Sequence, residues 1–277
     1  MRTKLFILLT LVSTNCFAQF NYGETLSKLK DWELISDKNE KQEYVERIKS
    51  LTESENIFRF FDLNELHIVD VDQDGLKDIL FSGEGGIDGG ITEVYRSNGV
   101  SFECILSVIG KLCDVSTYQP GEKMVLRINN YACCGGFTNV FENYVLTLQG
   151  GKIKYSLQSK EEYVPEMVFP TVFFDRPIAF KIRNEEYKLR FSPVIDDTTE
   201  IVRPFDAYGN TIDVYSKNTI GYAIAERKDV TGRIWWFVKI DNNTSGVHRD
   251  WNAVGDNNKE PTYSLGWMSS RYLDLIK

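Results

Sequence analysis

From residue 65 onward, the chain is a succession of short apolar, β-branched and aromatic runs separated by turn residues. Runs of this length, bounded by Gly, Asn and Pro, predict β-strands. The segments 97–99, 120–121 and 149–151 are of hairpin length, which favours antiparallel pairing. We therefore expect a mainly β protein with a largely antiparallel sheet. Because there is no repeat of roughly 40 to 50 residues, we expect a meander or sandwich instead of a propeller.

The pattern predicts individual strands throughout this region. The expected strands are 66–69, 77–81, 92–96, 102–108, 112–117, 124–129, 140–148, 152–157, 178–183 and 186–191. Before them, residues 37–53 show the best helical pattern, because Asp37 and Glu40 have capping-box spacing and apolar residues recur from Tyr44 to Leu51. We expect a short helical unit within residues 19–60.

The N-terminus has the pattern of a secretory signal peptide. A basic start is followed by an apolar run and small or polar residues, which predicts cleavage after Ala18 and removal of residues 1–18. Lipidation at Cys16 is a less favoured alternative, because Asn15 fits a lipobox poorly. We expect a secreted or periplasmic protein without a transmembrane segment, since no later run reaches the length of a membrane helix.

The charge of the chain argues against nucleic-acid and anionic-membrane partners. The whole chain carries a net charge of −8, and loss of residues 1–18 leaves 30 basic against 40 acidic residues, a net charge of −10. Both kinds of partner require a basic face.

One acidic loop, residues 70–78, has the spacing of a calcium site. Carboxylates stand at loop positions 1, 3, 5 and 9, and Gly75 at position 6 permits a sharp turn. A bound Ca²⁺ would relieve the repulsion between these carboxylates. The alternative is a solvated acidic turn, which this spacing makes less favoured. The predicted ligands are Asp70, Asp72, Asp74, the carbonyl of Leu76, and Asp78.

We expect this calcium to be structural, because all of its ligands lie in one contiguous loop, whereas a catalytic metal keeps an open position. The loop is not an EF-hand, since position 12 is Phe81 and strand-like runs flank it. With its Asp-x-Asp-x-Asp-Gly-x-x-Asp pattern it resembles the calcium loop of FG-GAP/VCBS repeats. The resemblance covers about twenty residues and occurs once.

The cysteines of the exported chain are even in number, which makes disulfides the default expectation. Adjacent cysteines bond to each other only through a strained geometry. We therefore expect each of the two adjacent cysteines to reach one of the other two, and the pairing stays open. The four are Cys104, Cys113, Cys133 and Cys134.

A polar, turn-rich stretch at 193–213 predicts a linker between a calcium-loop β domain, 61–192, and a C-terminal domain, 214–277. The latter contains a hairpin pattern over 221–240 and the closing sequence Gly-Trp-Met-Ser-Ser-Arg-Tyr-Leu at 266–273. With the Trp-Phe-Val-Lys strand at 236–239, this sequence resembles a bacterial SH3-like domain. The resemblance implies a small β-barrel.

Such barrels often bind extended peptides through aromatic grooves. The candidate ligand-binding residues are Tyr222, Trp235, Trp251, Tyr263 and Trp267, although about half of the aromatics are expected in the core. Trp235 and Trp236 must point to opposite faces of their strand. Because Val238 shares a face with Trp236, we expect Trp236 inward and Trp235 outward.

These features favour an exported, non-enzymatic binding or adhesion-type protein. Calcium is its expected structural cofactor, and a cell-envelope or extracellular peptide or protein its expected partner. No catalytic motif supports an enzyme. A cell-wall hydrolase or hydrolase accessory that uses carboxylates is one alternative, and a secreted inhibitor or immunity protein is another.

Overall fold

The computed structural model describes residues 38–49, 63–84, 90–115, 124–131, 138–150, 152–200, 209–242 and 260–276. The predicted signal peptide, the lipidation alternative at Cys16, and Trp251 lie outside these residues. The described part is mainly β, as the sequence predicts, and it contains one α-helix. That helix is not long and apolar enough to cross a membrane.

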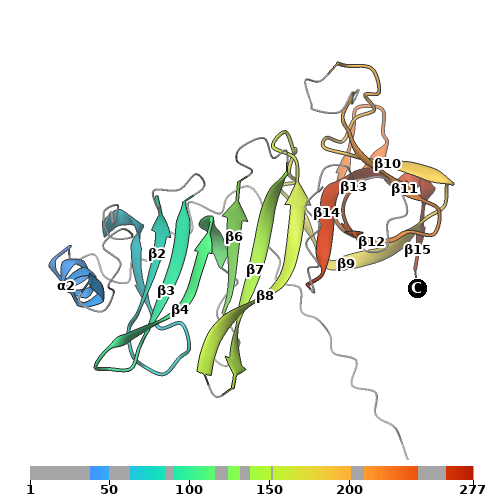
Figure 1. Cartoon of the computed structure of the whole chain (residues 1–277). Helices are drawn as coiled ribbons and strands as arrows, with labels where there is room; N and C mark the ends of the chain where they lie inside the picture. The colour runs from blue at the N-terminus through green and yellow to red at the C-terminus, as the bar shows by residue number, and fades with distance from the viewer. Residues whose placement is uncertain are drawn as a thin grey trace, which may run out of the picture.

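The elements follow the chain as two groups of strands after the helix (Figure 1). The first group comprises α2 (Lys38–Lys49), the 3₁₀ helix η3 (Leu63–Glu65), β1 (Leu66–Val69), β2 (Asp78–Gly83), β3 (Ile91–Ser97), β4 (Phe102–Ile109), β5 (Lys111–Val115), β6 (Val125–Asn130), β7 (Asn139–Gln149) and β8 (Lys152–Tyr163). The second comprises β9 (Phe173–Ile182), β10 (Glu186–Arg190), β11 (Thr211–Ser216), β12 (Ile220–Lys228), β13 (Ile234–Asp241), β14 (Thr262–Ser269), the 3₁₀ helix η5 (Ser270–Tyr272) and β15 (Leu273–Leu275).

The first sheet is an antiparallel meander in the order β1-β2-β3-β4. Helix α2 packs on it through Val45, which joins a cluster with Leu66, Phe81 and other apolar residues of the sheet. Arg47 of the helix also lies 4.8 Å from the ring centre of Phe102. The predicted helix is therefore confirmed, and the expected meander is found in this sheet.

A second core joins the meander to the strands that follow it. Its buried residues come from β2, β3 and β4 on one side and from β5 to β8 on the other. The step between the two sheets is a tight turn at Gly110, whose φ is +120°. A Cβ at this position would lie 2.8 Å from the carbonyl oxygen of Asn129, so the sequence needs glycine there.

The second sheet runs from β5 through β8 into the C-terminal strands, in the order β15-β9-β12-β13-β14-β8-β7-β6-β5. The step between its halves is the parallel pairing of β14 with β8, in which Tyr263 faces Glu161. Glu161 is 1% exposed and bridges Arg127 of β6 and Lys239 of β13. This buried ion network ties the two halves together.

The C-terminal strands form a curved array in the order β15-β9-β12-β13-β14-β10-β11 (Figure 1). Strands β15 and β11 stand at its two ends and are not paired with each other, so the closed SH3-like barrel is not confirmed. Strands β9 and β10 belong to this array through their pairing, although they precede the predicted linker at 193–213. The predicted boundary at residue 214 would therefore separate β9 and β10 from the strands with which they pair.

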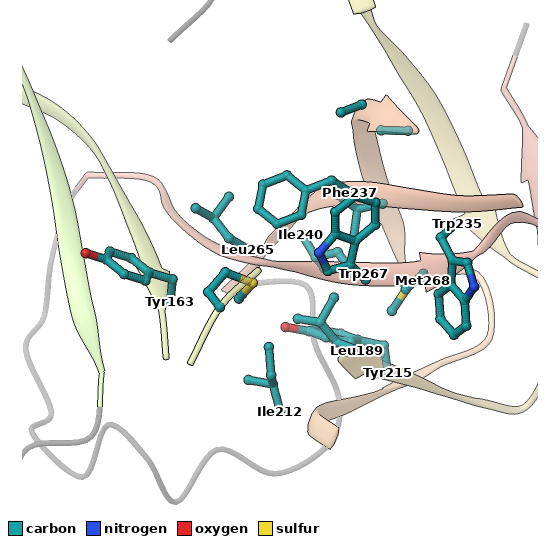
Figure 2. Close-up of a cluster of buried hydrophobic side chains, with 14 of the residues drawn as sticks. Tyr163, Leu189, Ile212, Tyr215, Trp235, Phe237, Ile240, Leu265, Trp267 and Met268 are labelled. Atoms are coloured by element: carbon teal, nitrogen blue, oxygen red, sulfur yellow. The ribbon is translucent and has the colours of Figure 1, made fainter. Parts of the chain in front are cut away.

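The core of this array is rich in large rings (Figure 2). Phe237 lies 5.2 Å from Trp267 and 5.9 Å from Phe169, measured between ring centres. Trp235 shares the face of Phe237 and is 2% exposed, so the prediction that it points outward is wrong. The prediction failed because Val238 is also fully buried, so both faces of β13 are covered and the alternation does not say which is the core.

The predicted disulfides are contradicted for the two cysteines that the structure describes. Cys104 on β4 and Cys113 on β5 are both free. The thiol of Cys113 donates to the carbonyl of Arg127 at 3.2 Å, and burial raises its pKa to about 12. This thiol is buried in the cluster beneath Phe141 and Tyr163, where it acts as a small apolar side chain. Cys133 and Cys134 lie outside the described residues.

Candidate metal centre

Loop 70–78 connects β1 to β2 and gathers three carboxylates at the end of the first sheet. Asp70, Asp72 and Asp78 each offer an oxygen, and these oxygens lie within 4.8 Å of one another. Two oxygens that share one Ca²⁺ at 2.3–2.6 Å are separated by at most about 5.2 Å. The three side chains are therefore close enough to coordinate one calcium ion together.

The turn in the middle of the loop is built by its own aspartates. Asp70 accepts hydrogen bonds from the backbone N–H groups of Asp74, at 3.2 Å, and Gly75, at 2.9 Å. Gly75 has a φ of +86°, a value that L side chains rarely adopt, and nothing lies within 4 Å of the position of its missing Cβ. Backbone conformation, not space, thus explains the glycine at loop position 6.

Asp78 is the fully buried member of the group. Its two oxygens accept hydrogen bonds from the N–H of Val71, at 2.9 Å, and from the N–H of Ser97, at 2.7 Å. Burial raises the pKa of Asp78 to about 6, against the opposing effect of these two bonds and with help from the charges of Asp72 and Asp74. Asp78 therefore anchors the loop to the end of β3 as well as facing the other carboxylates.

Arg96 of β3 supplies a counter-charge that the sequence pattern does not reveal. Its Nε donates to Asp72, and its Nη2 donates to Asp74 at 2.8 Å. These contacts raise the pKa of Arg96 above its ordinary value. The contact between Arg96 and Asp72 spans 24 residues of sequence, so no local signal predicts it.

The other predicted ligands are placed differently. Asp74 lies outside the close triad. One of its oxygens accepts a hydrogen bond from Arg96, and the other accepts the N–H of Leu76 at 2.9 Å. Leu76 is 36% exposed, and a role for its carbonyl stays a prediction. The loop contains four aspartates, and Arg96 pairs with two of them, so the group retains an excess of negative charge when it is ionised.

The described members of the predicted aromatic ligand set do not form one exposed surface. Trp235 and Trp267 are buried, at 2% and 0% exposed. Tyr222 on β12 and Tyr263 on β14 are half-buried, and the Lys239 ammonium lies 5.5 Å from the Tyr263 ring centre. A groove lined by all of these rings is therefore not formed by the described residues.

Comparison with protein-family models, with curated proteins and with solved structures finds no match for this chain.

Proposed function

We propose that this protein is a non-enzymatic binding protein of an extracytoplasmic space, and that loop 70–78 holds a structural Ca²⁺. The observation that carries the metal proposal is the approach of Asp70, Asp72 and Asp78 oxygens to within 4.8 Å. Loop 70–78 joins β1 to β2, and Asp78 bonds to the end of β3. A bound ion would therefore stiffen one end of the first sheet.

The recognition role is assigned to the C-terminal array, as an SH3-like unit for a cell-envelope or extracellular peptide or protein. What supports this assignment is the curved arrangement of seven strands around a core of rings, together with the closing sequence at 266–273. In this proposal, calcium orders the first half of the molecule and the partner binds the second.

The metal proposal is tested by thermal and urea unfolding of the chain in millimolar Ca²⁺, in Mg²⁺ and in chelator. A ligand that binds only the native state at one hundred times its Kd adds about 2.7 kcal/mol to the free energy of unfolding. We expect Ca²⁺ to stabilise the protein and Mg²⁺ to do so less, because Mg²⁺ demands a stricter octahedral geometry.

Asp72→Ala should abolish the calcium effect, since it removes one member of the triad. Asp175→Ala is the matched control, because Asp175 is an exposed aspartate of β9, a strand of the other sheet. An unchanged stability in Ca²⁺, or a calcium effect that survives Asp72→Ala, would show that the loop is an acidic turn held by Arg96.

A further inference from the structure

A cavity of about 350 Å³ lies at one end of the C-terminal array, where β10, the start of β13 and the end of β14 meet. Its volume is at the lower end of the range for small-ligand sites. Its wall combines three cationic side chains with three rings, Lys188, Arg190, Arg233, Tyr187, Trp235 and Tyr272. In a protein with a net charge of −8, such a cluster of cations is a local exception.

The three cations differ in the ion pairs that they already make. Lys188 and Arg190 share the carboxylate of Asp197, at 2.9 and 2.8 Å. Arg190 also donates to the side chain of Asn210 at 2.7 Å. Arg233 has no carboxylate within ion-pair distance in the described ranges, and its guanidinium carbon lies 5.7 Å from the ring centre of Trp235.

The turn before β13 holds Arg233 and Trp235 in place. Asp229 accepts the indole N–H of Trp235 at 2.9 Å and the backbone N–H of Arg233 at 3.1 Å. Hydrogen bonds from Thr231 and Trp235 keep the pKa of Asp229 well below its usual range, so it is ionised at neutral pH. A guanidinium that lies over a ring on a backbone fixed in this way is pre-organised to offer two N–H groups to one planar anion.

A buried hydroxyl borders the same cavity. Ser269 faces Trp235 in the strand register, so the two side chains lie on the same side of the sheet. Its Oγ is buried and makes no hydrogen bond within the part of the chain that the structure describes. Its carbonyl accepts the hydroxyl of Tyr187 at 2.8 Å, which leaves the Oγ as an available polar group at this wall.

Two exposed apolar side chains line the cavity beside its charged residues. Ile195 is 55% exposed and Tyr272 is 41% exposed. The Tyr272 ring packs edge-on against Tyr187, with 5.6 Å between ring centres. A ligand bound in the cavity can therefore contact an aliphatic and an aromatic side chain, which suits an apolar group next to its charge.

We propose that this cavity binds the carboxylate end of a peptide. Arg233 pairs with the carboxylate, and Ile195 and Tyr272 contact the apolar side chain beside it. The ion pairs favour a singly charged group. Asp197 pairs with Lys188 and Arg190, whereas Arg233 has no ion pair within the described ranges, so one cation is left for one carboxylate. This inference rests on the proposed binding function and specifies the chemistry of its partner.

The test uses the full chain and calorimetric titration with acetylated tripeptides that end in Ala, Leu or Phe. Each peptide is supplied both as the free acid and as the C-terminal amide. We expect the free acids to bind in the millimolar range, and the amides about tenfold or more weakly, as loss of a charge-assisted pair implies. The Leu and Phe peptides should bind more tightly than the Ala peptide.

Arg233→Ala should remove the preference for the acid, and Arg233→Lys should restore part of it. Arg176→Ala is the matched control, since Arg176 is an exposed cation of β9 away from the cavity. Unchanged thermal unfolding of each variant shows that the array is folded.

Equal binding of acid and amide, no binding of any peptide, or an acid preference that survives Arg233→Ala would overturn the proposal. Tighter binding of inorganic phosphate than of every peptide would also overturn it, in favour of a different anion. Repeating the titration in chelator and with Asp72→Ala separates the two proposals. Peptide binding that persists there supports the cavity even if calcium has no effect on unfolding.

Discussion

Loop 70–78 and the cavity beside Arg233 are opposite in charge and in construction. The loop takes four carboxylates from nine consecutive residues and bends them around its own backbone. The cavity takes its cations from β10 and from the turn before β13, and its other walls include residues of β13, the end of β14 and η5. A contiguous site depends on one turn, whereas an assembled site depends on the packing of several strands.

The difference also appears in how the charges are balanced. In the loop, one arginine meets two of the aspartates, and the carboxylates are left in excess. In the cavity, one aspartate meets two of the cations, and a cation is left in excess. Each site thus has an unbalanced charge of the sign opposite to its proposed ligand. Four experiments test this comparison of the two halves.

The largest effect is expected where the two halves meet, at Glu161. Glu161→Ala removes the common partner of Arg127 and Lys239 and leaves buried cations behind. Breaking a buried pair in this way costs about 3–5 kcal/mol. Urea unfolding measures the loss, and Glu226→Ala, an exposed carboxylate of β12, should change stability little. A similar stability for both variants would mean that the halves do not depend on this network.

Asp78→Ala should have the next largest effect on stability. This variant tests the role of the loop in folding separately from its role in metal binding. Two backbone N–H groups, of Val71 and Ser97, lose their acceptor, and each unsatisfied buried group costs about 1–3 kcal/mol. Unfolding is measured in chelator so that no metal contributes. Asp74→Ala, at a more exposed site, should cost under about 1 kcal/mol. Equal losses would show that Asp78 does not anchor the loop.

A smaller, pH-dependent effect is expected for Asp229→Asn in the cavity half. The pKa of Asp229 is lower in the folded protein than in the unfolded chain, where it is about 3.9. Its stabilising contribution is therefore complete above that unfolded value and is lost as the pH falls through the folded one. Melting temperatures of wild type and variant should differ at pH 7 and converge in acid. A constant gap would exclude an ionised Asp229 as the cause.

The smallest effect concerns the thiols. Of the two described cysteines, Cys104 is exposed, whereas Cys113 is buried with a pKa raised to about 12. Burial also raises the pKa of Cys104, but because its side chain is accessible we expect Cys104 to be alkylated faster than Cys113 in the native protein. Peptide mapping by mass spectrometry after brief iodoacetamide treatment measures both sites. Protection of Cys104 that a reductant removes would restore the disulfide prediction.

The sequence reveals those parts of the fold and site that are encoded locally. Strand β1 is predicted at its exact bounds, and the loop is recognisable because its four carboxylates and its glycine lie within nine consecutive residues. The alternation along β13 correctly places Trp235 and Trp236 on opposite faces, but it does not identify the inner one. That choice depends on Phe169 and Trp267, which reach β13 from other segments.

Features that depend on distant pairing are not predicted. Strand β15 is three residues long, too short for a periodic signal, and it exists because it pairs with β9. In the sequence, Arg96 looks like an ordinary strand residue, and only the pairing of β3 with β2 places it beside the loop. The cavity is missed for the same reason. In the sequence Arg233 looks like an ordinary turn residue, and only the folded chain places it over the Trp235 ring and pairs Trp235 with Ser269 of β14.

The parallel ladder between β14 and β8 limits which fragments of the protein can fold on their own. A fragment that starts at residue 214 loses β9 and β10, and exposes the edges of β12 and β14 that paired with them. A fragment that ends at residue 192 exposes the edge of β8 that paired with β14. Such unpaired edges recruit strands from other chains. Truncations at the linker are therefore expected to yield aggregates.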